Sequence, residues 1–342
     1  INLEFCFRYS IMKKLKLTCA HAIVKHLIAQ KILIDGKKQP LFPGVFGIFG
    51  HGNVACLGQA LEENKDKLPT YRGHHEQNMA LTGVAYSRAK RRKQIFIATS
   101  SVGPGSTNLL TAAAVAMSNR IPILFLPGDT YANRMPDPVL QQVEHFNNPG
   151  ITANDAFKSV TRYFDRITRP EQILQSLPQA IQLMIDPADA GPACLSLCQD
   201  TQGETFDYPE EFFKERVHNI RRPKPDDFEI KKAAEKIKSC KNPIIISGGG
   251  VFYSDAMEEL GNFAIKHNIP VTQTVMGYST MKRDHSHFLG PIGGLGGKAA
   301  NNFAKKTDLA IAIGTKLADF TTGSWANFEN PDFGLVSLNI TR

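Results

Sequence analysis

The chain has 342 residues, of which 42% are hydrophobic and 21% are charged, an ordinary globular composition with enough length for two domains. Its formal net charge is +8, and the basic excess lies in the short runs 13–16, 88–93 and 221–224. No aromatic residues interleave with these runs, and no helix-turn-helix or zinc-finger spacing accompanies them, which argues against a nucleic-acid-binding protein.

Cellular location is predicted from the apolar runs and the cysteines. No apolar run approaches the length of a membrane span, and residues 1–14 lack the pattern of a signal peptide. The six cysteines form no metal-type pairs, and alternation over 194–198 predicts a strand with buried free thiols. A cytoplasmic protein without membrane contact is therefore expected. Because the chain begins with Ile and Met12 could be a natural start, it is expected to be part of a longer frame.

Short apolar runs alternate with amphipathic stretches in the first part of the chain. Thr18 caps a helix with apolar residues at helical spacing. The predicted helices are 18–30, 54–64, 75–90 and one opened by a glycine-rich loop at 103–119, and the predicted strands are 44–50, 67–73, 94–100 and 120–129. The strands are continuously apolar rather than alternating, which predicts a parallel sheet covered on both faces.

A change of composition divides the chain. Residues 199–228 are polar, contain prolines and show no strand pattern, so a surface linker is predicted. The alternation then restarts with helices at 229–239, 254–267 and 297–306 and strands at 242–250, 269–274, 308–315 and 334–340. The prediction is an α/β protein of two doubly wound parallel-sheet domains, 13–190 and 229–342, joined by a linker at 191–228. The second domain has a Rossmann-like rhythm and is expected to be incomplete at its C-terminal end.

Two glycine-rich turns of the second domain invite a nucleotide interpretation. The turn at 247–251 lacks the required glycine spacing, and the turn at 293–299 follows a segment with no strand pattern. Both are predicted to be tight packing turns, and no phosphate-binding loop of the P-loop type is present. The histidines are scattered, so no metal site is predicted in this chain.

Two features of the first domain are chemically ambiguous. Glu76 stands at the start of a predicted helix, where the helix dipole favours any acid, so a solvated carboxylate is the simplest interpretation. At 103–108 a Gly-Pro-Gly turn leads into Ser106, Thr107 and Asn108 at another helix start. Free backbone N–H groups there suit a polar or anionic ligand, but a well-capped helix explains the residues equally well.

Four segments in this order carry a family resemblance: 44–54, 75–89 with its His-Glu-Gln start, 99–129 with the Gly-Pro-Gly turn, and 242–271. Together they resemble the thiamine-diphosphate-dependent enzymes of the acetohydroxyacid synthase and benzoylformate decarboxylase type. Residues 48–54, 91–93, 136–146 and 154–172 are similar to the branch that opens a cyclic 1,2-dione by hydrolysis of a carbon–carbon bond in myo-inositol breakdown. Residues 13–190 then correspond to the pyrimidine-binding domain and 229–342 to the central domain.

The resemblance implies roles for five residues. Glu76 matches the glutamate that bonds the aminopyrimidine of thiamine diphosphate and promotes its activation by general acid–base chemistry. Gly50, His51 and Gly52 match a loop that faces the cofactor, and Gln141 matches a glutamine beside the substrate. For His51 and Gln141 a polar turn residue and an exposed helix position are the alternatives.

The sequence departs from the family in one respect. The family's third domain holds Mg²⁺ and the diphosphate with a Gly-Asp-Gly motif and a later asparagine, and the only Gly-Asp pair here is 128–129. The chain is therefore expected to be a fragment that is inactive alone, without a metal ligand of its own. Related synthases hold FAD in the central domain, but none is expected here. A homodimer or homotetramer through the pyrimidine domain is implied. An acetohydroxyacid-synthase-like lyase or transferase and a non-catalytic truncated scaffold remain the alternatives.

Overall fold

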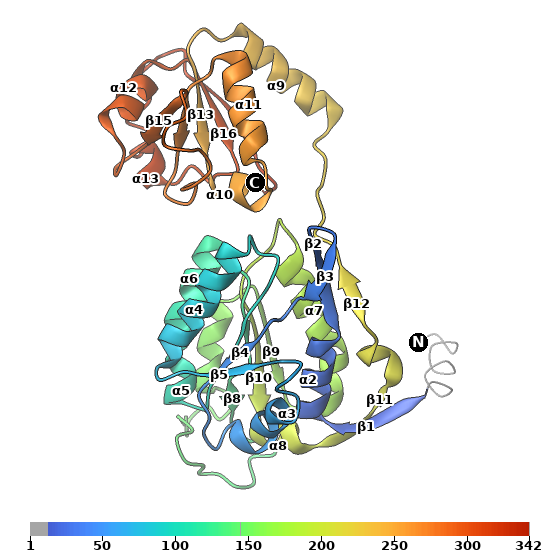
Figure 1. Cartoon of the computed structure of the whole chain (residues 1–342). Helices are drawn as coiled ribbons and strands as arrows, with labels where there is room; N and C mark the ends of the chain where they lie inside the picture. Colours follow the sequence, from blue (N-terminus) through green and yellow to red (C-terminus); the bar gives the residue numbers. More distant parts are fainter. Residues whose placement is uncertain (1–12, 144, 342) are drawn as a thin grey trace. The chain divides into compact units, whose positions relative to one another are not determined.

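The structure, a computed structural model, describes residues 13–143 and 145–341. The chain divides between Arg221 and Arg222 into two compact units, and each is described by itself (Figure 1). The division falls within 219–226, a stretch with neither helix nor strand. Within the described residues, no helix is both long and apolar enough to span a bilayer.

A parallel sheet forms the centre of the first unit. Its strands follow the order β5-β4-β6-β7-β10-β8, with β9 also paired to β10. Their bounds are β4 (Val45–Gly47), β5 (Thr70–Arg72), β6 (Ile97–Thr99), β7 (Leu124–Phe125), β8 (Gly128–Asp129), β9 (Tyr163–Ile167) and β10 (Ala193–Cys198). All described pairings in this sheet are parallel, as the continuous apolar runs predicted.

Helices cover both faces of this sheet (Figure 1). One face packs against α4 (Glu76–Ala89) and α6 (Leu110–Asn119), which present small residues such as Ala80 and Ala113. The other face packs against α2 (Cys19–Ile28), α3 (Gln59–Glu62) and α7 (Ile173–Ile185). Shorter helical segments are η1 (Val54–Gly58), α5 (Pro104–Thr107), η2 (Ala153–Ser159), η3 (Pro170–Gln172), α8 (Gln199–Gly203) and η4 (Glu210–Phe213). The doubly covered sheet that the sequence predicted is confirmed.

Residues near the start of α2 determine where this helix begins and which face it buries. Thr18 has an extended backbone and its side chain accepts a hydrogen bond from the His21 backbone N–H, which caps the helix as predicted. Ile23 and Leu27 lie one turn apart and are buried, with exposed fractions of 0% and 1%. Spacing and cap together therefore fix the helix and the face it buries.

The linker prediction for 191–228 is wrong over most of its length. Residues 193–198 form the buried strand β10, with Cys194 and Cys198 as free thiols. β11 (Thr205–Pro209) pairs antiparallel with β1 (Lys14–Thr18). β12 (Arg216–His218) pairs with β2 (Gln30–Ile34), which forms a hairpin with β3 (Lys37–Pro40). β11 and β12 are polar because one side of each meets solvent, and their partners lie far away in sequence, so no local pattern reveals them.

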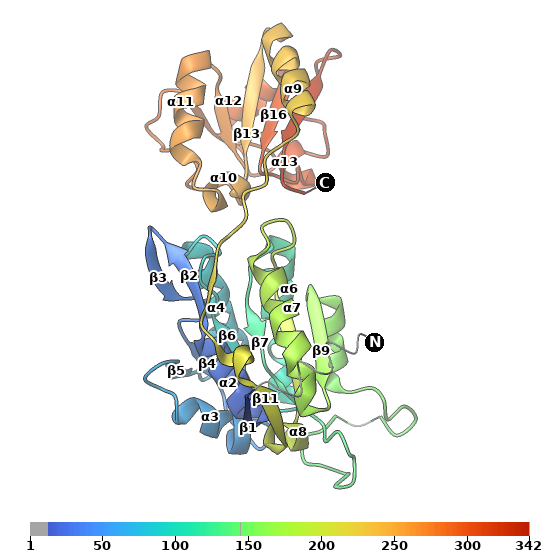
Figure 2. The same ribbon diagram turned by 90° about the vertical axis from the view of Figure 1, so that its right-hand side faces the viewer.

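One long segment of the first unit has no helix or strand among its described residues. Residues 130–152 run from β8 to η2 as an extended loop that projects from the unit (Figure 2). Its large apolar side chains are unusually exposed, with Met135 and Phe146 at 90% and Leu140 at 74%. Loops of this length without secondary structure are uncommon in compact domains and are usually either functional or linker segments.

The second unit has a five-stranded parallel sheet of order β15-β14-β13-β16-β17. The strands are β13 (Pro243–Ser247), β14 (Val271–Gln273), β15 (Phe288–Pro291), β16 (Leu309–Ile313) and β17 (Gly334–Leu338). One face packs against α9 (Asp227–Ser239) and α11 (Met257–His267), and the other against α12 (Lys298–Lys306). Two short helices, α10 (Gly249–Tyr253) and α13 (Asp319–Thr322), follow strand ends. The doubly wound prediction is confirmed here too.

The glycine turns of this unit are packing turns. β13 and β16 mark the point where the strand order reverses, the usual ligand crevice of such folds. There Gly250 donates its backbone N–H to the Gly314 carbonyl at 2.9 Å, and a Cβ on Gly250 would lie 2.5 Å from the Gly314 Cα. The turn at 293–299 does follow a strand, β15, so that part of the prediction is wrong. The space beside Gly293 is nevertheless taken by the protein's own backbone, because a Cβ there would lie 2.0 Å from the Phe320 carbonyl oxygen.

Candidate active site

Glu76 is the first residue of α4, which follows the carboxyl end of the parallel strand β5. His75 caps the helix by accepting a hydrogen bond from the Asn78 backbone N–H. The Glu76 side chain is half-buried and lies at the positive end of the helix dipole, an environment that suits a carboxylate. The sheet and the helix cap therefore place Glu76 at the carboxyl-terminal edge of the sheet, where parallel α/β folds bind ligands.

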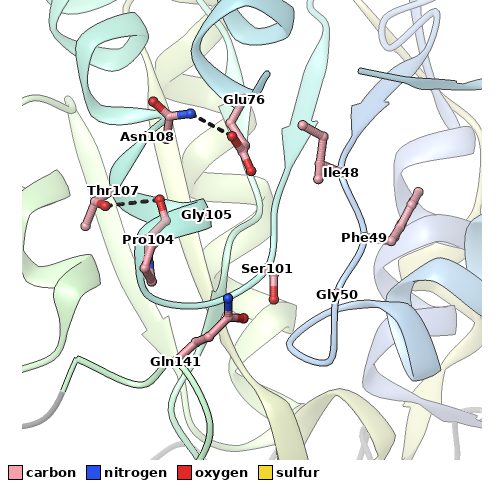
Figure 3. Close-up of a pocket in the computed structure, with 10 residues that line it drawn as sticks. All are labelled: Ile48, Phe49, Gly50, Glu76, Ser101, Pro104, Gly105, Thr107, Asn108 and Gln141. Atoms are coloured by element: carbon pink, nitrogen blue, oxygen red, sulfur yellow. Dashed lines mark hydrogen bonds between the residues drawn. The ribbon is translucent and has the colours of Figure 1, made fainter. Parts of the chain in front are cut away.

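A second element meets Glu76 at this edge. The chain leaves β6 at Thr99 and reaches Gly103, the N-cap of α5, and Asn108 caps the C-terminal end of that helix. The Asn108 Nδ2 group donates a hydrogen bond to Glu76 Oε2 at 2.6 Å (Figure 3). This short contact joins two helices whose residues are 32 positions apart in the sequence.

These residues line a pocket of about 630 Å³. Glu76 contributes its only charge, and the remaining lining is apolar or neutral: Ile48, Phe49, Gly50, Ser101, Pro104, Gly105, Thr107, Asn108 and Gln141. Figure 3 shows the second carboxylate oxygen of Glu76 directed away from Asn108. A flat, largely apolar group with one hydrogen-bonding edge fits such walls, whereas an anionic group finds no cationic side chain among them.

Gln141 reaches this pocket from the loop 130–152. Two contacts hold its backbone. His51 Nε2 donates to the Leu140 carbonyl at 2.7 Å, and the Gln141 carbonyl lies so close to Gly103 that a Cβ on that glycine would be 1.8 Å away. Gln141 adopts a left-handed backbone with φ of 63° and Gly103 one of 57°. The glycine is therefore required for the approach of the loop to the Gly-Pro-Gly turn.

The three residues of the predicted loop Gly50-His51-Gly52 have different surroundings. Gly50 lines the pocket, and a Cβ on it would lie 2.6 Å from Ser101 Oγ. His51 is outside the lining and contacts Leu140 instead. Gly52 packs against Val102 and beneath Gly128. The structure thus brings Glu76, Gly50 and Gln141 together and places His51 and Gly52 behind them.

A buried polar network underlies the loop and the α5 turn. Asn154 donates to the Gly128 carbonyl at 2.9 Å and to Ser196 at 2.6 Å, and it accepts a hydrogen bond from Ser106 of α5. Asp129 accepts from Arg166 at 2.8 Å and from Ser196 at 2.5 Å. The one Gly-Asp pair of the chain, Gly128-Asp129, therefore forms hydrogen bonds within the core of the first unit.

Arg166 extends this network to the far end of the loop, where it donates to Thr152 and pairs with Asp155 at 2.9 Å. Burial alone would raise the pKa of Asp155, but hydrogen bonds from Lys158, the Thr152 backbone and Arg166 outweigh it and lower that pKa to about 2. The carboxylate is thus charged over the whole physiological range and anchors the end of the loop.

A smaller pocket of about 440 Å³ adjoins the first through Ile48 and Phe49 and is also lined by Arg72, Gly73 and His74. Among residues 13–143 and 145–341, no group of three or more His, Cys, Asp or Glu side chains is placed to hold a metal ion. Sequence reasoning did not single out Ile48, Phe49 or Ser101, and it left Asn108 undecided. Only the fold, which brings the ends of β4, β5 and β6 to one edge, identifies these residues.

The two-domain fold agrees with what the comparisons find. The description "Thiamine pyrophosphate enzyme, N-terminal TPP binding domain" belongs to the family model that matches residues 31–148, and "Thiamine pyrophosphate enzyme, central domain" to the one that matches residues 230–342. The chain belongs to the thiamine pyrophosphate enzyme family, of which it carries these two domains.

Curated relatives are more specific. The chain is 48% identical over 330 residues to proteins named 3D-(3,5/4)-trihydroxycyclohexane-1,2-dione hydrolase from Clostridium tetani and from Listeria monocytogenes serovar 1/2a. A relative of the same name from Clostridium perfringens is 48% identical over 328 residues. These alignments cover 96% of this chain but only 51% or 52% of each relative, so the chain spans about half the length of the relatives it matches.

The residues present fit one end of the cofactor that this family binds. The aminopyrimidine end of thiamine diphosphate is flat and offers ring nitrogens, which suits Ile48, Phe49 and the open oxygen of Glu76. The diphosphate end needs cationic or metal partners, and the lining contains no basic side chain. The pocket is therefore suited to the aminopyrimidine alone.

Proposed function

We propose that the protein to which this chain belongs is a thiamine-diphosphate-dependent hydrolase that opens the ring of 3D-(3,5/4)-trihydroxycyclohexane-1,2-dione in myo-inositol catabolism. The observation that carries the proposal is Glu76, a lone carboxylate in a mostly apolar pocket at the strand ends of a thiamine pyrophosphate-binding domain. The substrate is taken from the relatives at 48% identity.

Bound thiamine diphosphate supplies a carbon nucleophile that stores the electrons released when a carbon–carbon bond breaks. In our proposal Glu76 exchanges a proton with the ring nitrogen N1′ of the aminopyrimidine and so promotes formation of that nucleophile. Ile48 and Phe49 exclude water from the same face, and the Gln141 amide offers hydrogen bonds toward the substrate. Gly50 lets Ser101 approach the backbone at the pocket wall.

The test is an assay of the full-length gene product with the trihydroxy-dione and with pyruvate. Turnover of the dione with uptake of one water supports the proposal. Turnover of pyruvate alone points to an acetohydroxyacid-synthase-like lyase or transferase, and activity with neither leaves a non-catalytic scaffold as the better description. Flavin absorption is expected to be absent from the purified protein, and a yellow preparation with a flavin spectrum would contradict this.

We further propose that Mg²⁺ and the diphosphate are held by a domain outside this chain, and that the protein is a homodimer or homotetramer. The absence of basic residues from the pocket lining supports the first point. Met135, Leu140 and Phe146 are exposed apolar residues of the loop that carries the pocket residue Gln141, and they support contact with a further domain or subunit. Five free cysteines among the described residues support a cytoplasmic location, which fractionation would test.

A further inference from the structure

We propose that Asn108 is a positioning residue that determines which oxygen of Glu76 carries the proton exchanged with the ligand. The proposal rests on the function proposed above and assigns a task to a residue to which neither the sequence motif nor the family resemblance gave a role. Its basis is the geometry of the two side chains and of Gly105, which lines the same pocket.

The contact itself is strong and directional. Asn108 Nδ2 lies 2.6 Å from Glu76 Oε2, the short distance expected when an amide donates to a carboxylate. An amide nitrogen donates and does not accept. A proton on Oε2 would therefore face the amide hydrogens and lose the bond. When Glu76 is protonated, the proton belongs on Oε1.

Oε1 is the oxygen that the pocket can reach. A Cβ placed on Gly105, which lines the pocket, would lie 3.6 Å from Glu76 Oε1, so this oxygen faces the bare backbone of that glycine. Figure 3 shows Oε1 directed away from Asn108. Glu76 thus has one oxygen tied to the protein and one left open to a ring nitrogen.

Asn108 is itself held in place. Its backbone N–H donates to the Pro104 carbonyl at 3.1 Å, at the joint between α5 and α6. Leu109 beside it is fully buried, with an exposed fraction of 0%, in the core that α4 and α6 share. The donor is therefore fixed relative to α4, which carries Glu76, and the amide does not rely on a mobile loop.

The experiment uses the full-length protein with thiamine diphosphate and Mg²⁺. In Asn108→Ala the rate of hydrogen exchange at the reactive carbon of the bound cofactor is expected to fall by roughly 10- to 100-fold, the scale of losing one hydrogen bond to a charged group. The KM for the dione should change little, because Asn108 acts through Glu76. Asn119→Ala is the matched control, since that amide donates within its own helix, to the Val115 carbonyl and to Ser118 Oγ.

A double-mutant cycle separates positioning from general structural damage. In a Glu76→Gln background, Asn108→Ala should cause no further loss of exchange, because the oxygen it positions no longer carries an exchangeable proton. Independent losses that multiply would overturn the proposal. Asn108→Asp has the same shape without the donor, so it should lose at least as much; a wild-type exchange rate in this variant would also overturn it.

A readout without cofactor distinguishes failure of this proposal from failure of the proposed function. The infrared difference between the chain and its Glu76→Gln variant isolates the Glu76 carboxylate stretch. Removal of the donor in Asn108→Ala should shift that band, and Asn119→Ala should not. An unshifted band would refute the positioning role, whatever substrate the full-length protein turns over.

Discussion

The position of Glu76 depends on a local helix start, and its hydrogen bond depends on a residue distant in sequence. The His-Glu-Gln start and the small residues of α4 predict a helix with an acid at its N-terminus, and the structure has both. The partner at Oε2 comes from Asn108, which is 32 residues away, and nothing in either local sequence indicates the pairing. The acid could therefore be predicted from sequence, but its hydrogen bond required the parallel order of β5, β4 and β6.

The first prediction concerns Glu76→Gln in the full-length protein. The amide keeps the shape of the side chain but cannot ionise, so proton exchange at the reactive carbon of the cofactor should fall by about 10² or more. Cofactor binding should survive because the apolar walls Ile48 and Phe49 are unchanged. Exchange at the wild-type rate, measured by NMR after quenching, would show that Glu76 is not the activating acid.

The second prediction concerns Asn154, which is 1% exposed and joins α5, β8 and β10. Asn154→Ala leaves three buried polar groups without this partner, and the free energy of unfolding should fall by on the order of 3 kcal/mol. Urea denaturation followed by circular dichroism measures it. Asn147→Ala, an exposed change in the neighbouring loop, is the control and should alter stability little.

At the scale of elements, the hairpin and edge strands show what sequence reading missed. β2 and β3 flank Asp35-Gly36, both with positive φ, and an Asp-Gly pair after an apolar run is a recognised hairpin signal that the sequence contained. β11 and β12 offered no such signal, because their partners β1 and β2 lie near the other end of the unit's sequence. The central strands were predictable because burial on both faces leaves a continuous apolar run.

The third prediction concerns two histidines where α2, β2, β12 and η4 meet. His26 stacks on Phe212 and donates to its carbonyl, and His218 bonds Gln30. Burial lowers the pKa of His26 to about 4, with His218 and Arg216 adding to the effect. Burial and Arg216 likewise lower the pKa of His218 to about 4.

As the pH falls, both histidines therefore become protonated in the unfolded chain at a higher pH than in the folded chain. Their stabilisation is full above the unfolded value of 6.5 and is lost as the pH falls toward about 4. The loss should be on the order of 3 kcal/mol for His26 and smaller for His218, whose charge solvent partly screens. Urea midpoints at neutral and mildly acidic pH measure it. Exposed His267→Gln should keep this dependence, whereas His26→Gln with His218→Gln should flatten it; an unchanged slope in that double variant would contradict the assignment.

The fourth prediction belongs to the whole chain. The pocket offers one carboxylate and apolar walls to the aminopyrimidine, and its lining contains no cationic side chain for the diphosphate. The isolated chain is therefore expected to bind thiamine diphosphate weakly, even with Mg²⁺, and to show no ring opening. Isothermal titration calorimetry tests this, with the full-length protein as control. Micromolar or tighter affinity, roughly 8 kcal/mol or more, would reveal an anchor within these residues.

The glycine contact at the sheet of the second unit constrains how this protein can change over generations. A Cβ on Gly250 would lie 2.5 Å from the Gly314 Cα, and one on Gly314 would lie 2.5 Å from the Gly250 Cα. Each position is limited by the backbone of the other, so no second substitution at the facing site restores the space. In a library of single and paired variants, substitutions at Gly250 and at Gly314 should each prevent folding, and no pair of substitutions should restore it. Ordinary pairs of core side chains differ, because a smaller residue at one position can compensate for a larger one at the other.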